Sequence, residues 1–353
     1  MKRENRLVLL SSLQKRTEDE IREVFELMEN ELDWGYIIGQ LIHHRLSGYF
    51  IAYVPSDLKK YIFKEVDKQL SFIYKTNKVI TTSNMDFMQE VFYEFEEEKV
   101  VYAGLKGVIY NASVYEIGVR RSNDTDILVP EPELQKVDEI LRRKGFIQSV
   151  NSNRDEATRR EKIIQRMNFH DLIPYYKNVN DSLLVPYYKI DINFRVDNEK
   201  EGLTKKLFDY GTEIYSQNGY NVRGLKWATH LLHLCIHFYR EASHSIWVKD
   251  KRDCMLYKLI DIENTIRYLG VEKLQTWLDE IRKFGCDRDI FFTFYYLNQV
   301  YPNDIYMKLM KTTNAEYEVD EFTIVGTNEN VKREKAYIEE AFDLRYCIDF
   351  SKK

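Results

Sequence analysis

The chain has 353 residues, 44% of them hydrophobic, which is enough to bury a sizeable core and to form two domains. Its formal net charge of -5 gives no general attraction to nucleic acid, and its four scattered cysteines form neither a disulfide framework nor a zinc ribbon. The N-terminus lacks a signal-peptide pattern, and no apolar run is long enough to span a bilayer. We therefore expect a cytoplasmic protein without a membrane anchor.

An N-terminal helical region is predicted for residues 1–98. Thr17 and Glu20 have the spacing of a capping box, just before apolar residues that recur at helical spacing. Three further helices are expected, over residues 34–46, 56–74 and 84–98.

An α/β core is predicted for residues 99–200, centred on a strand over residues 123–129. Residues two apart on a strand point to the same face, so Asp124 and Asp126 are expected side by side, about 6.6 Å apart. Two bare carboxylates at that spacing repel each other by roughly 2.5 kcal/mol at an effective dielectric constant near 20. A divalent cation would turn this repulsion into ligation, and Mg²⁺ binds few carboxylates together with substrate phosphates. The pair is therefore a candidate metal site.

A second strand, over residues 188–196, contributes a third carboxylate. Ile190 and Ile192 alternate there with Lys189 and Asp191, so that one face is apolar and the other polar. Asp191 is therefore expected on the face opposite the core.

The remaining elements of the core follow from turn and capping signals. A helix is predicted over residues 133–144, ended by Gly145, and a second helix over residues 156–166. A strand over residues 169–176 is expected to pair with one over residues 183–196 through a turn at 178–181.

A C-terminal helical domain is predicted for residues 201–312, and all of its elements from Leu203 onward are expected to be helices. A charged tail is predicted for residues 313–353. The helix over residues 227–241 places His230, His233 and His237 in one stripe. These imidazoles could hold zinc. Because no Cys, Asp or Glu accompanies them on that face, we instead favour packing and hydrogen bonding at the wall of an active cleft, without bound zinc.

The order of motifs in the core resembles that of a known family. Leu105-Lys106-Gly107 is followed by Arg120, then by Asp124-Thr125-Asp126 with an apolar strand, and later by Asp191. This arrangement is similar to that of the uncharacterised bacterial nucleotidyltransferases, within the DNA-polymerase-β-like nucleotidyltransferase superfamily. Asp33-Trp34, residues 231–237 and residues 259–262 also have counterparts there, so the resemblance extends to about residue 300. Asn123 and Thr125 depart from the usual Gly or Ser and Ile, which bears on loop shape.

The resemblance implies an α+β fold, a mixed-sheet core flanked by two helical regions, and a metal-dependent transferase. Asp124, Asp126 and Asp191 would be the catalytic residues and would hold Mg²⁺, with two metal ions expected. The nucleotide would be bound by a glycine turn and by cationic side chains. The residues expected in that role are Gly104, Lys106, Gly107, Arg120, Arg195 and Lys258. Plainer interpretations also exist. Lys258 could form an ion pair with Asp261 one turn later on the same helix, and Lys106 and Arg120 could be ordinary surface charges.

The implied reaction moves an NMP group from an NTP, such as ATP, to a small molecule, peptide or protein. A long nucleic acid is not expected as acceptor, because basic residues in the core form only short clusters. Two alternatives remain: transfer of a different phosphoryl group on the same fold, and a non-catalytic nucleotide sensor. The preferred base, the acceptor and the oligomeric state stay open.

Overall fold

A computed structural model describes residues 1–150, 155–179, 182–249, 252–313 and 335–345, and the backbone of residues 323–324 and 331–332. Residues 180–181 of the predicted turn, and most of the predicted tail, lie outside this part of the chain. The chain divides into two compact units. We call residues 72–230 the sheet unit, and residues 1–71 with 231–353 the helical unit. Helices α5 (Lys64–Glu97) and α10 (Trp227–Ser243) contribute residues to both.

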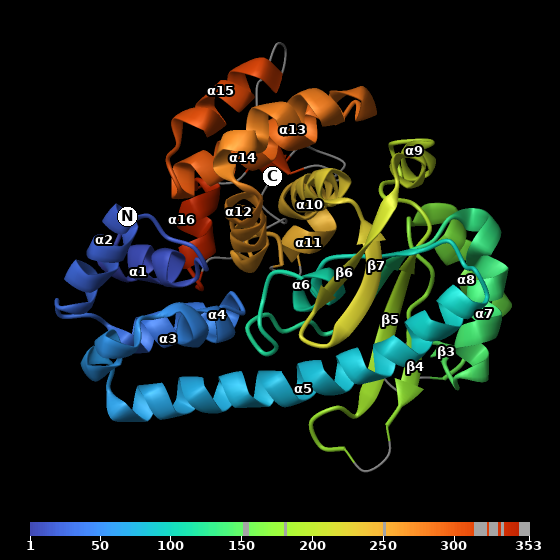
Figure 1. The fold of residues 1–353 in the computed structure, drawn as a ribbon, viewed down its shortest axis with the longest axis horizontal. Coiled ribbons are helices and arrows are strands. Elements are labelled where there is room, and N and C mark those ends of the chain that lie inside the picture. Colours follow the sequence, from blue (N-terminus) through green and yellow to red (C-terminus); the bar gives the residue numbers. More distant parts are fainter. Residues whose placement is uncertain are drawn as a thin grey trace. The chain divides into compact units, whose positions relative to one another are not determined.

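Seven strands of the sheet unit form one mixed sheet, which confirms the predicted α+β class (Figure 1). The strand order is β3-β4-β5-β2-β1-β7-β6. The strands are β1 (Ala103–Gly104), β2 (Thr125–Leu128), β3 (Ile147–Gln148), β4 (Tyr175–Asn178), β5 (Tyr187–Asn193), β6 (Thr212–Gln217) and β7 (Tyr220–Leu225). The other helices of this unit are α6 (Gly107–Asn111), α7 (Leu134–Arg143), α8 (Arg159–Asn168) and α9 (Leu203–Tyr210), with the 3₁₀ turn η2 (Glu131–Glu133).

The centre of the sheet joins the two strands that carry the candidate acids. β2 and β5 run parallel, and Asp126 is paired in register with Asp191. β1 pairs antiparallel with β2 and parallel with β7, which places the loop after β1 beside the same strands. β4 pairs antiparallel with β5, as predicted for the hairpin. Because partners in register point to one face of a sheet, Asp126 and Asp191 share a face.

Helices α5 and α7 bury the opposite face of the sheet. The apolar side chains that fill this layer include Met88 and Phe92 of α5, Val137 and Ile140 of α7, Ile127 of β2, and Ile190 and Ile192 of β5. Figure 1 shows α5 running across strands β4 and β5. The alternation predicted for β5 is therefore confirmed: its isoleucines enter the core, and Asp191 points to the other side.

The two helices predicted over residues 56–74 and 84–98 are wrong as separate elements. Ser56 begins a short 3₁₀ helix, η1 (Ser56–Tyr61), and a single helix of 34 residues, α5, follows. Residues 75–83 contain β-branched residues and Asn77, which only weaken a helix by tenths of a kcal/mol each, and no Gly or Pro that would end it. Packing of the helix on the sheet decides the outcome.

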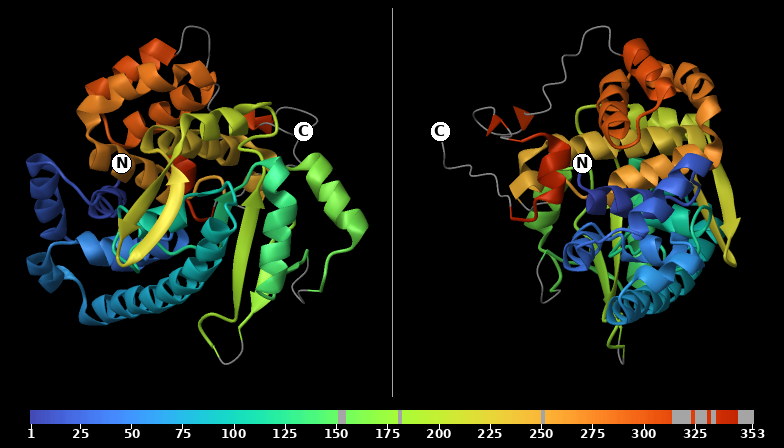
Figure 2. Two further views of the ribbon diagram at one scale, coloured as in Figure 1. Left: turned by 45° about the vertical axis from the view of Figure 1, so that its right-hand side comes forward. Right: turned by 90° about the vertical axis from the view of Figure 1, so that its left-hand side faces the viewer.

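The prediction of helices only from Leu203 onward is also wrong, because residues 212–225 form the hairpin β6–β7 at the edge of the sheet (Figure 2). Its two-residue turn is Asn218-Gly219, with φ of 58° and 84°. Asn-Gly is a favoured sequence for turns that need positive φ at both central residues. The signal was present in the sequence, but the apolar pattern on either side was assigned to helices.

The helical unit begins with the predicted capping box at Thr17 and Glu20, which is confirmed at the start of α2. Its helices are α1 (Arg3–Ser11), α2 (Glu18–Met28), α3 (Trp34–His43), α4 (Ser47–Tyr53), α11 (Ser245–Lys249), α12 (Tyr257–Leu269), α13 (Leu274–Ile281), α14 (Asp287–Val300), α15 (Asp304–Thr313) and α16 (Tyr337–Phe342). Short elements are η3 (Val271–Lys273), η4 (Arg282–Phe284) and the pair β8 (Thr323–Ile324) and β9 (Val331–Lys332). No helix within the described residues has both the length and the apolar composition to cross a membrane.

Candidate active site

Three carboxylates converge on the face of the sheet opposite the buried core. Asp126 and Asp191 are register partners on β2 and β5, and Asp124 lies immediately before β2. Their side chains are 15%, 16% and 31% exposed, respectively, so each remains reachable while being largely shielded from water. Three acids drawn from two neighbouring strands therefore form one cluster.

Two lysines accompany the carboxylates. The Lys189 ammonium lies 2.7 Å from Oδ2 of Asp191 and 3.4 Å from Oδ2 of Asp124, and it thus contacts acids from both strands. The Lys106 ammonium lies 3.0 Å from Oδ1 of Asp126. Lys106 was expected near the site, whereas Lys189 was not singled out. Its position two residues before Asp191 on the polar face of a strand was the available signal.

The cluster contains three carboxyl groups and only two lysines. Burial and the charge of Asp124 raise the pKa of Asp191 to about 8. Burial opposes ionisation of Asp124 as well, but Lys189 and Lys106 hold its pKa below the usual range. Oδ1 of Asp191 is buried and lacks a hydrogen-bond partner among the described residues. Oxygen ligands, excess acid and one unsatisfied carboxylate oxygen fit a divalent cation of the Mg²⁺ type.

The loop between β1 and α6 holds Lys106 in an unusual backbone conformation, with φ of 50° and ψ of -116°. Such conformations cost of the order of 1–3 kcal/mol outside glycine and persist where the surroundings impose them. Here the loop is fixed on one side by the hydrogen bond from the Leu105 amide to the Asp126 carbonyl. The backbone therefore directs Lys106 towards the carboxylates at a local cost in energy.

Glycine at position 107 is explained by close packing. A Cβ atom there would lie 1.8 Å from Oγ of Ser122 and 2.6 Å from Nη1 of Arg120. At Gly104, a Cβ would meet Val108 at 2.9 Å. The absence of a side chain at Gly107 lets the glycine loop lie directly against the segment that leads to Asp124, and its absence at Gly104 allows close packing on Val108 of α6.

Arg120 contacts the segment that leads to Asp124 through Ser122. Its side chain is buried, its Nη1 donates to Oγ of Ser122 at 2.6 Å, and its guanidinium lies over the ring of Tyr110 at 5.4 Å. The structure thus brings Arg120 to the glycine loop, as the motif suggested. A direct contact between Arg120 and phosphate stays a prediction.

The other two predicted nucleotide contacts lie in different surroundings. Arg195 follows β5 and donates to Oε1 of Glu131 at 3.0 and 3.1 Å near the surface. Lys258 belongs to the helical unit, where it is buried, forms an ion pair with Glu241 and donates to the Arg252 carbonyl at 2.6 Å.

The plainer interpretation of Lys258, a pair with Asp261 one turn later on the same helix, is not what the structure contains. Oδ1 of Asp261 instead accepts a hydrogen bond from the Tyr49 hydroxyl at 2.6 Å. Contacts of Arg195 and Lys258 with the nucleotide stay predictions.

A cavity of about 290 Å³ adjoins the acid cluster within the sheet unit. It is lined by residues 121–125, by residues 184–189 and by Ile80, Asn84 and Met88 of α5. Asp124 is the acidic residue of this lining, and Arg121 and Lys189 are its cations. The cavity therefore opens beside one carboxylate and one lysine of the cluster.

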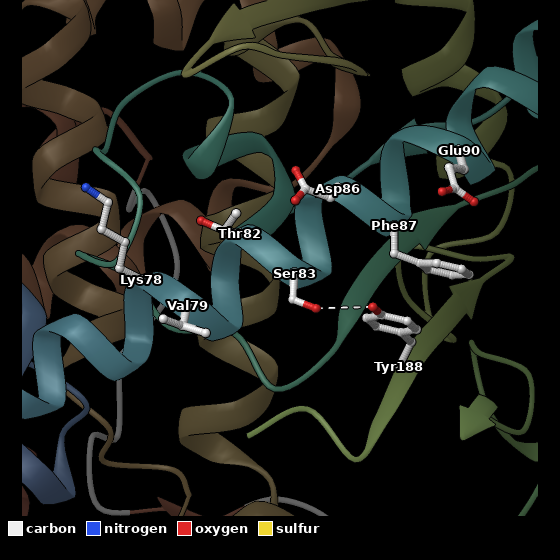
Figure 3. Close-up of a pocket in the computed structure, with 8 residues that line it drawn as sticks. All are labelled: Lys78, Val79, Thr82, Ser83, Asp86, Phe87, Glu90 and Tyr188. Carbon is white, nitrogen blue, oxygen red and sulfur yellow. Dashed lines mark hydrogen bonds between the residues drawn. The ribbon is translucent and has the colours of Figure 1, made fainter. Parts of the chain in front are cut away.

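A larger, more open cavity of about 630 Å³ follows one side of α5 and shares Tyr188 with the first (Figure 3). The Tyr188 and Ser83 hydroxyl oxygens lie 3.1 Å apart. The Tyr188 ring stacks on Phe87, with centroids 4.2 Å apart and planes 6° apart. These contacts attach α5 to β5 beside Lys189.

The histidines of α10 are buried. His230 packs edge-on against Tyr110 at 5.9 Å, and burial together with Arg120 lowers the pKa of its imidazole to about 3. In the helical unit, Nε2 of His237 lies 3.1 Å from Oε1 of Glu241, one turn later on the same helix. The expectation that no acid accompanies the histidines on their face is therefore wrong. The absence of zinc at these histidines stays a prediction.

A separate cluster of potential ligands lies in the helical unit. Asp253, Cys254 and Glu340 bring three ligand atoms within 4.8 Å of one another. The Cys254 sulfur lies 3.3 Å from Oδ2 of Asp253 and 3.8 Å from Oε2 of Glu340, which are hydrogen-bonding distances for a thiol. The single thiol proton can be donated to one of these two carboxylates at a time.

Comparisons with known proteins bear on the family. No curated protein matches the sequence. A solved structure described as an antigenic nucleotidyltransferase-like protein from Paracoccidioides brasiliensis is 10% identical in sequence to this chain. The match covers 57% of this chain and 94% of that protein, with a TM-score of 0.34, and it carries no argument about the family. The model of a family described as uncharacterised nucleotidyltransferase matches residues 30–302, well over half of the chain and all of the acid cluster. The chain therefore belongs to this uncharacterised nucleotidyltransferase family.

Proposed function

We propose that the chain is a divalent-metal-dependent enzyme that moves an NMP group from an NTP to a hydroxyl or similar group of a small molecule, peptide or protein. Its membership of a nucleotidyltransferase family supports the reaction type. The observation that carries the metal dependence is the convergence of Asp124, Asp126 and Asp191 on one face of two parallel strands, with one buried oxygen of Asp191 unpaired. We place this chemistry in the cytoplasm.

The carboxylates of Asp124, Asp126 and Asp191 would hold Mg²⁺. The ion would supply positive charge to the phosphate oxygens as charge develops on them. Lys106 and Lys189 would each add an ammonium group next to the triphosphate. Both contact carboxylates already, so their positions are fixed before the substrate binds.

The reaction would be an in-line displacement. The acceptor oxygen forms a bond to the α-phosphorus as the bond to the bridging oxygen of the β-phosphate breaks, and pyrophosphate leaves. The hydroxyl proton passes to a carboxylate of the cluster.

The cavity beside Asp124 supports a compact acceptor group. Its volume of about 290 Å³ is just below the range of about 300–1,000 Å³ for small-molecule sites. The net charge of -5 also opposes a polymer that carries many phosphates. A side chain of a peptide or protein could enter the same cavity.

The test is incubation of the protein with Mg²⁺, cell extract and each NTP, labelled either at the α- or at the γ-phosphate. We expect the α label on an acceptor, with release of pyrophosphate and a matching increase in acceptor mass. Transfer of the γ label would identify phosphoryl transfer instead. Saturable nucleotide binding without turnover would identify a sensor.

A second titration tests the class of acceptor. Single-stranded RNA, tRNA and duplex DNA should bind weakly at about 50 mM salt, without the loss of orders of magnitude in affinity by 200 mM that marks a binder of many phosphates. Submicromolar binding with that salt dependence would contradict a small acceptor.

A further inference from the structure

Every carboxylate of the cluster already has an ammonium partner. The Lys189 ammonium lies 3.4 Å from a carboxylate oxygen of Asp124 and 2.7 Å from one of Asp191. The Lys106 ammonium lies 3.0 Å from a carboxylate oxygen of Asp126. Lys189 contacts acids from two different strands, which is the position that a cation shared between those acids would take. Two divalent ions at this cluster would have to share it with two lysines.

Lys189 is held in this position by the sheet. It lies within β5, paired with Tyr176 of β4, and its side chain is 21% exposed. Because residues two apart on a strand share a face, Lys189 stands next to Asp191 whatever the state of the surrounding loops. The long side chain could swing, but its ammonium would then leave two partly buried carboxylates behind.

The charge of the cluster permits one divalent ion in addition to the lysines. Two ammonium groups together carry the charge of one divalent cation, so one such ion with Lys106 and Lys189 gives the same total as two ions without lysines. The oxygen that Lys189 contacts, Oδ2 of Asp191, is occupied, whereas Oδ1 is buried and unpaired. One ligand oxygen is therefore committed to lysine and one remains for a metal ion.

We propose that this site binds one divalent ion, and that the Lys189 ammonium occupies the position of a second. The proposal rests on the proposed metal-dependent function and departs from the pair of ions that the family resemblance implies. Lys189 is then a site residue that acts as a fixed cation between Asp124 and Asp191. Removing its charge opens that position to a further divalent ion.

The experiment counts Mn²⁺ ions bound per chain by titration calorimetry, confirmed by the electron paramagnetic resonance signal of free Mn²⁺. The variants are Lys189→Met and, as a matched control on the neighbouring strand, Lys177→Met, which lies over the ring of Phe87 outside the cluster. Lys189→Gln is the second variant, in case the methionine substitution impairs folding. Circular dichroism and thermal unfolding check each variant.

We expect one Mn²⁺ per chain in the wild-type protein and in Lys177→Met, and two in the Lys189 variants. The second ion should bind to the Lys189 variants at least tenfold more tightly than any second Mn²⁺ binds to the wild type. Two ions in the wild type, or a single ion in folded Lys189 variants, would overturn the inference and leave the proposed function standing. If neither the wild type nor any variant binds Mn²⁺, both proposals are wrong.

Discussion

Buried charges occur in both units, but they are arranged in opposite ways. In the helical unit, Arg267 grips both oxygens of Glu20 at 2.6 and 2.7 Å and donates to Glu263 at 2.7 Å. The Tyr306 hydroxyl occupies the other oxygen of Glu263 at 2.7 Å. Each carboxylate oxygen in this network has a donor, so the network is closed without any added ligand.

The acid cluster of the sheet unit has three carboxyl groups and two lysines, and one oxygen of Asp191 is left without a donor. A closed network stabilises one packing arrangement, whereas an open one with a carboxyl oxygen that lacks a donor can still accept a ligand. The contrast indicates which buried charges support the structure and which serve the chemistry. It also gives different expected results when each network is broken.

The largest effect is expected from Asp126→Asn in the open network. The change keeps the shape of the side chain and removes the charge, so label transfer should fall about 10³-fold and Mg²⁺-dependent nucleotide binding should be lost. Because repulsion within the cluster is relieved, the midpoint of unfolding should stay constant or rise slightly. Activity and chemical denaturation measure the two effects.

The control is Asp209→Asn, which removes an exposed carboxylate paired with Lys205 on α9. It should leave both activity and stability close to wild type. If Asp126→Asn instead unfolds the protein while folded molecules keep full activity, the carboxylate is structural and the assignment is wrong.

The opposite result is expected from Arg267→Met in the closed network. Removing the guanidinium leaves Glu263, which is fully buried, without its cation, so the free energy of unfolding should fall by roughly 3 kcal/mol. Mn²⁺ binding by the folded protein should not change. Arg22→Met, at an exposed pair with Asp19 on α2, should cost less than about 1 kcal/mol. Equal losses from the two substitutions would remove the distinction between the networks.

Gly107→Ala tests how closely the glycine loop must pack to maintain the open network. The added Cβ would lie 1.8 Å from Oγ of Ser122, and relieving that overlap should cost about 2 kcal/mol of stability. Label transfer should fall more than tenfold, because the overlap pushes the segment that carries Asp124. Gly39→Ala is the control, since its Cβ would meet only Leu344 at 3.8 Å. Unchanged activity in Gly107→Ala would show that the loop can shift without consequence.

Much of the fold could be predicted from local patterns. The alternation of Ile190 and Asp191 gave the face of β5, and Thr17 and Glu20 gave the start of α2. The hairpin β6–β7 was missed although Asn218-Gly219 marked its turn, because its flanking apolar residues also suit a helix. The continuity of α5 depends on packing against a sheet that local sequence does not reveal.

The site could be predicted only in part for a similar reason. The spacing of Asp124 and Asp126 was visible in the sequence, and pairing of their strand with β5 brought Asp191 into register. Lys189 resembles any lysine on the polar face of a strand until that pairing places Asp124 opposite it. The conformation of Lys106 could not be foreseen either, since left-handed backbone is disfavoured for lysine and is imposed by its surroundings.

Acid should weaken both units through buried imidazoles that remain neutral, and His44 of the helical unit allows a test. Burial, together with His43, lowers the pKa of His44 to about 3. The unfolded chain therefore binds a proton below about pH 6.5 that the folded chain does not. Stability should fall as the pH drops from about 6.5 towards 3, by about 1.4 kcal/mol per pH unit for this residue.

The measurement is chemical denaturation of the wild type and of His44→Gln between pH 7 and 4. Carboxylates contribute equally to both proteins, so the difference in slope isolates His44. Parallel slopes would mean that His44 takes up its proton in the folded protein as readily as in the unfolded chain.

The smallest effect is expected from Tyr188→Phe, which cuts one link between α5 and the strand of the open network. The ring keeps its stack on Phe87 and loses only the hydroxyl contact with Ser83, so the loss should be about 1 kcal/mol. Ser83→Ala should cost a similar amount, and the double variant should cost no more than either alone, because both remove the same hydrogen bond. Mn²⁺ binding should be unchanged in all three, since the ladder between β2 and β5 places Lys189 and Asp191 without this hydroxyl. A lower Mn²⁺ affinity in Tyr188→Phe alone, with stability intact, would show that the tyrosine takes part in the acid cluster and does more than attach the helix to the sheet.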